Sequence, residues 1–266
     1  MVEQPAILAV IGGGNMGAAL VHGLLRSGRK ADSIVVCEVS PERRNELAGM
    51  FAGVRITDSI VSCSEAVIAV KPADVHGAVR AAAAAGATRL VSIAAGVRLA
   101  ALQAAGGAAV RVIRAMPNTP ATVGLSTTAF AASPACTEND RAWANELLSS
   151  VGFVVELDES MLDAFTGLAG SGPAYLFYVA EALREAAIAE GFDADSSAAI
   201  VAKMLVGSAA LLEREPTRAA ELRARVTSPN GTTAAGVAEL DARNVRDALL
   251  SAVRAATRRS KELGDA

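Results

Sequence analysis

The sequence has few of the residues on which several kinds of binding site depend. Its 266 residues include two histidines and three cysteines, and the cysteines are scattered without CxxC spacing. Neither a disulfide framework nor a metal site is therefore predicted, and we interpret Cys37, Cys63 and Cys136 as small core residues. One tryptophan, two tyrosines and six phenylalanines are too few for the stacking platforms that hold single-stranded nucleic acid.

Charge of one sign and long apolar runs are also missing. The chain carries 25 basic and 28 acidic residues, a net charge of −3, so no basic stripe for nucleic acid is expected. Apolar residues make up 52% of the chain, but charged residues interrupt every stretch that approaches the ~20 apolar residues of a membrane-spanning helix. The first residues lack the basic start of a secretory signal. We expect a cytoplasmic protein that does not bind a membrane.

Motifs of several large enzyme classes are absent as well. The sequence contains no GxSxG elbow, no HExxH pair and no phosphate-binding loop with a Walker lysine. Hydrolysis and phosphoryl transfer therefore lose support.

The length and the pattern of the chain indicate two domains, because one domain typically takes ~150 residues. Residues 1–158 alternate short apolar runs with alanine-rich helical stretches, the pattern of an α/β domain with a parallel sheet. The predicted strands are Ile7–Ile11, Ile34–Cys37, Ala66–Val70, Leu90–Ile93, Val110–Ile113, Leu125–Ala131 and Val154–Leu157. The predicted helices are Met16–Arg26, Pro41–Met50, Ala73–Ala85, Leu99–Ala104 and Glu138–Ser150.

Residues 159–266 show no further strand signal and are predicted to form an all-helical domain. Asp193 is a candidate helix start, and Gly191 is a candidate stop for the helix before it. Small residues on these helices would permit close packing within one chain or between two. The predicted helices are Leu162–Ala169, Ala174–Ala189, Ser196–Glu213, Ala219–Val226, Thr232–Asp241 and Val245–Lys261.

A glycine-rich turn follows the first strand directly. Residues Gly12 to Gly17 read GGGNMG and lead into a helix, so this GxGxxG pattern has the strand-turn-helix context of a dinucleotide-binding site. Gly12 permits the tight turn, Gly14 lets a pyrophosphate approach the backbone, and Gly17 lets the helix pack on the strand. We therefore predict a Rossmann-type domain that binds NADPH or NADH.

The residues after the second strand leave the choice between these two cofactors open. Glu38 ends the strand, where an acidic side chain usually accepts hydrogen bonds from the adenosine ribose, which favours NADH. Ser40, Arg43 and Arg44 follow, and a hydroxyl with two guanidinium groups is suited to the ribose phosphate of NADPH. The two arginines are equally well explained as a solvated basic face behind a helix cap.

Three further loops are predicted to follow strand ends, where ligands bind in open parallel sheets. They are Val70–Pro72, Ser92–Gly96 and Arg114–Pro120. Pro72 directs Lys71 toward extended geometry, and Ala94 with Ala95 offers a flat wall for a nicotinamide. A surface lysine and an ordinary tight turn are the structural alternatives.

Two segments of the helical half are rich in helix-start signals. They are Gly170–Tyr175 and Thr227–Thr233, and the second gathers hydroxyls and backbone amides before a helix. Helix amino termini of this kind bind carboxylates, although an ordinary capped hairpin is the alternative. A dinucleotide, a carboxylate and few acid-base groups together favour hydride transfer to an activated carbon such as that of a protonated imine.

These motifs make the sequence similar to the pyrroline-5-carboxylate reductases, and the similarity spans nearly the whole chain. The matching segments are Ile11–Gly17, Ala69–Pro72, Arg114–Pro120, Leu168–Tyr175 and Val226–Thr233. The resemblance implies reduction of 1-pyrroline-5-carboxylate to L-proline, the last step of proline biosynthesis, with NADPH or NADH. It also implies a helical domain through which two subunits interlock, and rings assembled from such dimers.

The resemblance also implies roles for single residues. Thr233 is the candidate catalytic residue, because the corresponding threonine bonds near the ring nitrogen. Whether a side chain or water supplies the imine proton stays open. The candidate substrate-binding residues are Glu159, Ser228, Gly231, Thr232 and Thr233. The candidate cofactor-binding residues are Gly12, Gly13, Gly14, Asn15, Met16, Gly17, Ser40, Ala69, Val70, Lys71, Pro72, Ala94, Ala95 and Asn118.

The sequence departs from the family pattern in two places. Asn230 replaces the first glycine of the usual Ser-Pro-Gly-Gly-Thr-Thr, and asparagine tolerates left-handed geometry better than most residues. Residues 57–65 are short and lack the expected asparagine after the third strand, with Asp58 or Ser59 as substitutes.

Two other functions compete with the reductase. One is a dinucleotide-binding regulator without turnover, which the Thr232–Thr233 pair disfavours. The other is a related hydroxyacid dehydrogenase, but that reaction needs a lysine where this chain has Leu176.

Overall fold

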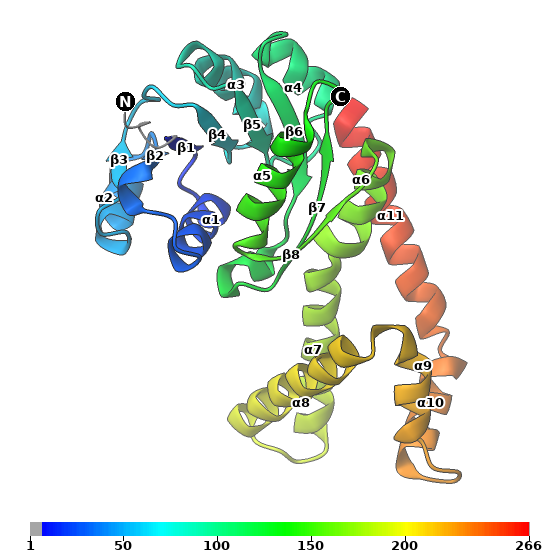
Figure 1. Cartoon of the computed structure of the whole chain (residues 1–266). Coiled ribbons are helices and arrows are strands. Elements are labelled where there is room, and N and C mark those ends of the chain that lie inside the picture. The colour runs from blue at the N-terminus through cyan, green and yellow to red at the C-terminus, as the bar shows by residue number, and fades with distance from the viewer. Residues whose placement is uncertain (1–6, 266) are drawn as a thin grey trace. The chain divides into compact units, whose positions relative to one another are not determined.

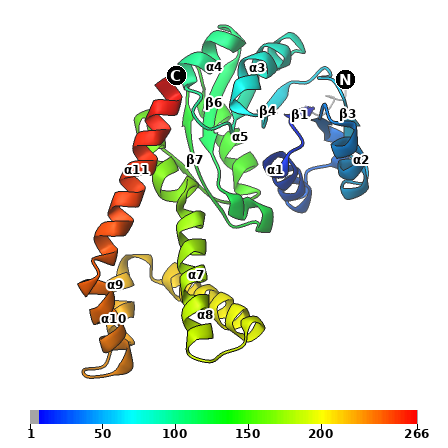
Figure 2. The same cartoon turned by 180° about the vertical axis from the view of Figure 1, so that it is seen from behind.

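The structure is a computed structural model that describes residues 7–265 and divides into two compact units (Figures 1 and 2). The sheet unit comprises residues 1–171 and 254–266, and the helical unit comprises residues 172–253. The sequence predicted a division after residue 158, where the strands end, and that domain boundary stays a prediction.

One eight-stranded sheet forms the centre of the sheet unit. Its strand order is β3-β2-β1-β4-β5-β6-β7-β8, and every neighbouring pair is parallel except β6 and β7. The strand order switches between β1 and β4, from strands added on one side of β1 to strands added on the other, as in Rossmann-type folds. The strands are β1 Leu8–Ile11, β2 Ile34–Cys37, β3 Arg55–Thr57, β4 Glu65–Ile68, β5 Arg89–Ser92, β6 Arg111–Met116, β7 Ser126–Ala132 and β8 Gly152–Glu156.

Helices cover both faces of this sheet, which explains why its central strands are apolar throughout. Leu8 and Val10 point into a core shared with helices α1, α2 and α5, whereas Ala9 and Ile11 point into a core shared with α3, α4 and α6. Figure 1 shows α1 and α3 on opposite sides of β1. The helices are α1 Asn15–Arg26, α2 Pro41–Met50, α3 Val75–Ala84, α4 Leu99–Gly106, α5 Glu138–Ser149 and α6 Leu162–Phe165.

These elements confirm the predicted α/β class, with bounds that shift by a few residues. Helix α2 has the bounds predicted for it, because Ser40 caps it and Pro41 occupies its first turn. One strand was missed: β3 is three residues long, lies at the sheet edge and contains Arg55.

Buried acidic residues sit among arginines at the start of β4 and α5. Glu65 pairs with Arg29 at 2.8 Å and with Arg89 at 2.5 Å. Asp140 closes a capping box with Thr137, and its Oδ2 lies 2.9 Å from Nε of Arg111. Burial alone would raise the pKa of Asp140, but hydrogen bonds from Thr137 and Arg111 outweigh it and hold that pKa below its usual value.

The last turns of the chain belong to the sheet unit. Ser260 Oγ donates a hydrogen bond of 2.7 Å to Asp163, and Arg98 Nε donates one of 3.1 Å to the carbonyl oxygen of Gly264. A π-helical turn, Thr166–Gly170, continues α6, where the sequence predicted one regular helix over residues 162–169. Such turns interrupt helices mainly at functional sites.

The helical unit has almost no core of its own. Of its side chains only Ser197 and Val201 are buried, while Leu176, Phe177 and Met204 are among many large apolar residues that are exposed. Its helices are α7 Gly172–Ala189, α8 Ala194–Arg214, α9 Ala219–Arg225, α10 Thr232–Ala242 and the first part of α11 Val245–Asp265. Asp193 caps α8 and Gly191 has a φ of 99°, which confirms both predicted signals.

Helix α8 is long and apolar enough to cross a membrane by length and composition, although Lys203 interrupts it, and 11% of its most apolar stretch is buried. One such helix is weak evidence for a membrane span.

Candidate active site

The glycine-rich turn occupies the carboxyl end of β1 and has the geometry predicted for it. Gly12 has a φ of 103°, and a Cβ on this residue would lie 2.5 Å from the carbonyl oxygen of Ala69. A Cβ on Gly17 would collide with the carbonyl oxygen of Gly12. Both residues therefore have to be glycine, one for its backbone conformation and one for the close approach of α1 to the turn.

The start of α1 fits the pyrophosphate of a dinucleotide. Gly14 is the N-cap residue, no side chain caps the helix, and its first turn contains no acidic residue. A Cβ on Gly14 would meet nothing within 4 Å, so the space in front of these amides is open. A helix start with uncapped amides and open space attracts an anion, which is the test that a phosphate-binding turn has to pass.

The other predicted cofactor residues lie at the same edge of the sheet. Gly12 N donates a 2.8 Å hydrogen bond to the carbonyl oxygen of Cys37, and Ala69 N donates one of 2.8 Å to that of Ile11. The loops after β1, β2 and β4 are thereby fixed side by side. Val70, Lys71 and Pro72 follow β4, and Ala94 with Ala95 follows β5. Lys71 has the extended conformation expected before Pro72, with φ −63° and ψ 152°.

Glu38 and Ser40 bring side chains to this edge after β2. The carboxylate of Glu38 accepts a 2.8 Å hydrogen bond from Gly13 N and a 2.9 Å bond from Ser40 N. Ser40 Oγ accepts one of 3.2 Å from Arg43 N, as an N-cap of α2 does. The acidic residue at the end of β2 is therefore held against the phosphate-binding turn itself.

The side chain of Asn118, at the end of β6, is taken up by structural contacts. Its Nδ2 donates a 3.0 Å hydrogen bond to the carbonyl oxygen of Ala169, and its Oδ1 accepts bonds of 2.9 Å from Thr127 N and 3.2 Å from Ser126 Oγ. These bonds fix the π-helical turn against β7.

Glu159 lies at the end of β8 beside a buried arginine. Its Oε1 accepts a 3.1 Å hydrogen bond from Arg114 Nη1 and a 2.7 Å bond from Leu99 N. The guanidinium of Arg114 also reaches Asp163 at 3.7 Å. Sequence reasoning missed any role for Arg114 or Asp163, because their pairing joins residues that are 49 positions apart and follows no local pattern.

The predicted substrate-binding block begins helix α10 in the helical unit. Gly231 is the N-cap, no side chain caps this helix, and Thr232 and Thr233 are exposed in its first turn. Gly231 N donates a 3.0 Å hydrogen bond to the carbonyl oxygen of Ser228. Asn230 has a φ of 59°, so asparagine does adopt the left-handed conformation that its place in the motif requires.

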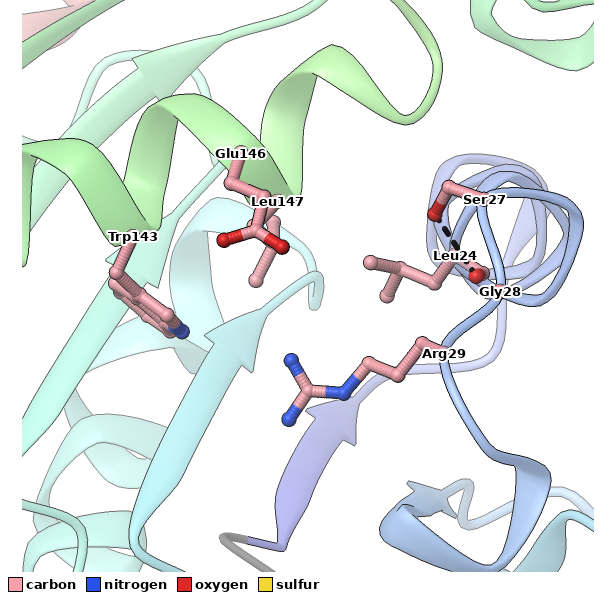
Figure 3. Close-up of a pocket in the computed structure, with 7 residues that line it drawn as sticks. All are labelled: Leu24, Ser27, Gly28, Arg29, Trp143, Glu146 and Leu147. Carbon is pink, nitrogen blue, oxygen red and sulfur yellow. Dashed lines mark hydrogen bonds between the residues drawn. The ribbon is translucent and has the colours of Figure 1, made fainter.

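A pocket in the sheet unit lies away from these residues. A cavity of about 250 Å³ is lined by residues at the end of α1 and on α5, among them Arg29, Trp143 and Glu146 (Figure 3). Helix α1 leaves the carboxyl edge of the sheet, so its far end lies at the amino edge, away from the phosphate-binding turn. No cluster of three metal-ligating side chains occurs within residues 7–265.

Comparisons with known proteins agree with the two parts of the site. Residues 159–263 match a family model described as pyrroline-5-carboxylate reductase dimerisation, and residues 7–96 match one described as NADP oxidoreductase coenzyme F420-dependent. The pyrroline-5-carboxylate reductase of Mycobacterium tuberculosis is 38% identical, with 99% of this chain and 98% of that protein covered. That of Synechocystis is 40% identical over 97% and 98%.

Solved structures of pyrroline-5-carboxylate reductases are also similar to this chain. The reductase from Coxiella burnetii is similar with a TM-score of 0.90 and 29% identity, covering 98% of this chain and 99% of the other. The Plasmodium falciparum pyrroline carboxylate reductase with NADP bound gives a TM-score of 0.85 at 25% identity, with 97% and 98% covered.

Proposed function

The chain belongs to the pyrroline-5-carboxylate reductase family, and we propose from this that it reduces 1-pyrroline-5-carboxylate to L-proline with NADPH or NADH. This is the last step of proline biosynthesis. The observation in the structure that carries the proposal is the uncapped start of α1 with open space before Gly14. A regulator or a hydroxyacid dehydrogenase would also need that turn, but neither accounts for the exposed threonine pair of α10.

The sheet unit supplies the residues that hold the cofactor. The amides from Gly14 to Gly17 face the diphosphate, and Ser40 with Glu38 lies where the adenosine ribose belongs. Val70 to Pro72 and the small side chains of Ala94 and Ala95 provide the wall for the nicotinamide. When bound, the cofactor supplies the hydride.

The helical unit supplies the residues that hold the substrate. The uncapped amides at the start of α10 suit its carboxylate, and Gly231 with Ser228 shapes the turn before them. Thr232 and Thr233 present hydroxyls beside these amides, and we assign Thr233 to the ring nitrogen. A protonated imine carries its positive charge on that nitrogen and accepts hydride at the adjacent carbon, so no buried general acid is required.

Glu159 acts from the sheet unit as a further substrate contact. Arg114 and Leu99 N fix its Oε1 atom, so the orientation of the carboxylate is set before any ligand arrives. A carboxylate oriented in this way stabilises a cationic imine by attraction of opposite charges. Either a side chain or water delivers the imine proton.

The protein works as a homo-oligomer. Its helical unit exposes large apolar residues and matches a dimerisation family, which supports a homodimer with further assembly into a ring. Three free cysteines support a reducing, cytoplasmic location. A net charge of −3 supports the absence of nucleic-acid binding, and we propose no membrane partner.

The proposed function is tested by mixing the purified full-length protein with the reduced cofactor and the substrate and measuring the conversion of both. We expect loss of absorbance at 340 nm when NADH or NADPH is mixed with 1-pyrroline-5-carboxylate at neutral pH, and formation of L-proline in equal amount. Binding of reduced cofactor without oxidation, under conditions in which the protein is folded and assembled, would instead identify a regulator. A 2-hydroxy acid that reduces the oxidised cofactor would identify the dehydrogenase.

A further inference from the structure

Two negative charges stand at the carboxyl end of β2, where the adenosine ribose of the cofactor belongs. The first is Glu38, whose two carboxylate oxygens are held by Gly13 N at 2.8 Å and by Ser40 N at 2.9 Å. These bonds leave the carboxylate with lone pairs but no proton to donate. A ribose hydroxyl can donate to it, whereas a phosphate cannot.

The second negative charge is that of Glu42, which is bonded to Ser40, the residue that would serve a phosphate. Ser40 has one hydroxyl proton, and it is donated to Glu42 Oε2 at 2.8 Å. Backbone hydrogen bonding at the start of α2, with help from that hydroxyl, lowers the pKa of Glu42, so this carboxylate is ionised at neutral pH. Glu42 therefore occupies the donor and offsets the positive end of the helix that would otherwise favour a phosphate.

The neighbouring arginines are committed to other partners. Arg43 Nε donates a 2.7 Å hydrogen bond to the carbonyl oxygen of Gly13, and its Nη1 lies 2.6 Å from Glu46. Arg44 Nη1 donates bonds of 2.9 Å to the carbonyl oxygens of Glu38 and Val39. Both guanidinium groups thus brace the loops, and Glu46 offsets the charge of Arg43.

On the premise that the chain is the reductase described above, we propose that Glu38 makes it select NADH over NADPH. The two cofactors differ only at the 2′ position of the adenosine ribose, which is a hydroxyl in NADH and a phosphate in NADPH. The hydroxyl gains an ionised acceptor at Glu38. The phosphate meets the charges of Glu38 and Glu42. The Ser40 hydroxyl is already donated to Glu42, and the guanidinium groups of Arg43 and Arg44 are already anchored to other partners.

The test measures the binding of each reduced cofactor to the assembled, full-length protein by isothermal titration calorimetry, in the absence of substrate. We expect NADH to bind at least tenfold more tightly than NADPH. The variant Glu38→Gln should lower that ratio to about one, by weakening NADH and strengthening NADPH. Glutamine has one acceptor oxygen, so it can no longer accept hydrogen bonds from both backbone amides. A resulting shift of the glycine-rich turn would weaken the binding of both cofactors alike. The ratio of the two affinities therefore reports the loss of the charge.

Two further variants complete the experiment. Glu42→Ala changes an exposed residue and frees the Ser40 hydroxyl, so NADPH affinity should rise severalfold while NADH affinity stays within twofold. Glu146→Gln, at the cavity on the amino edge of the sheet, removes the same charge elsewhere and should leave the ratio unchanged.

Other outcomes overturn the proposal. Equal or tighter binding of NADPH to the wild type would mean that Arg43 and Arg44 leave their present partners for the phosphate. An unchanged ratio in Glu38→Gln would remove Glu38 as the selecting residue. Binding is measured without substrate, so the cofactor preference is tested separately from the reaction. A protein that prefers NADH but does not oxidise it would contradict the proposed reductase function and leave the proposed cofactor preference standing. Failure to bind either cofactor would contradict both.

Discussion

The two compact units differ in how much of their apolar surface they bury by themselves. The sheet unit encloses two cores, one on each face of the sheet, whereas Val201 is the one hydrophobic side chain buried within the helical unit. A unit with its own core can hold a cofactor site at the edge of its sheet. A unit without one needs another surface to cover it, so helix α10, to which we assign the substrate, stands on a part of the molecule that depends on assembly.

The largest effect is expected from breaking that assembly. Ile200, Met204 and Leu211 are exposed and share one face of α8, because their separations are close to whole turns of a helix. The variant Met204→Glu places a charge in the centre of this stripe. We expect the oligomer to dissociate in analytical ultracentrifugation and turnover to vanish, while cofactor binding to the sheet unit changes less than about twofold.

The variant Met204→Leu is the matched control, since it keeps an apolar side chain of similar volume and should stay assembled and active. A monomeric Met204→Glu protein with normal turnover would contradict the dependence of the helical unit on a second chain.

The second-largest effect distinguishes substrate binding from cofactor binding by the removal of one hydroxyl group. Thr233→Ala removes the hydroxyl assigned to the ring nitrogen, and this hydroxyl accepts a hydrogen bond from the N–H of the protonated imine. We expect catalysis to fall by about a hundredfold. Stopped-flow or steady-state kinetics should show this loss in kcat/KM, with the Kd of NADH unchanged in a fluorescence titration.

Thr227→Ala is a suitable control, because the Thr227 hydroxyl is occupied by the carbonyl oxygen of Arg223 at 2.6 Å. If Thr233→Ala weakened cofactor binding and turnover equally, the substrate would have been assigned to the wrong residues.

The third effect concerns the stability that the sheet unit generates by itself. Asp140→Asn keeps an acceptor for the cap of α5 but loses the ion pair with Arg111, and we expect a loss of about 2 kcal/mol in the free energy of unfolding at pH 7. The folded state lowers the pKa of Asp140, so its contribution is present above about pH 4 and is lost as the pH falls through the folded value.

Urea unfolding of wild type and Asp140→Asn at pH 7 and pH 3 measures this difference. The difference in the free energy of unfolding between the two proteins should be smaller at pH 3 and should not depend on protein concentration. An equal gap at both values would show that the loss comes from packing rather than from charge.

The same division explains how much of the molecule the sequence could predict. Local signals predicted α2 with its bounds, because Ser40 and Pro41 act on adjacent residues. They also predicted the glycine turn, because Gly12 has a positive φ and Gly17 packs against Gly12 five residues before it. Asn230 was predicted to tolerate its left-handed backbone for the same local reason. The strand β3 was missed because three residues at an edge carry too little apolar pattern.

What the sequence could not give is the pairing of distant side chains. Glu38 was recognised as an acidic residue at a strand end, but its bond to Gly13 across 25 positions appears only in the fold. The pairing of Arg114 with Glu159 spans 45 positions and decides which way a candidate substrate contact points. The candidate site residues could thus be listed from motifs, while their electrostatic surroundings depend on tertiary structure.

The smallest expected effect is a pH dependence of stability that arises from a buried thiol in the core of the sheet unit. Burial, with a smaller contribution from Cys37, raises the pKa of Cys63 from about 9 to about 11. The unfolded chain ionises first as the pH rises, so this contribution to stability is present below pH 9 and is lost as the pH rises through 11. Urea unfolding should show a decline in the free energy of unfolding over this range that is smaller in Cys63→Ala. Because both thiols lie in the sheet unit, the decline should be the same at low and high protein concentration, and a concentration-dependent decline would assign it to the subunit interface instead.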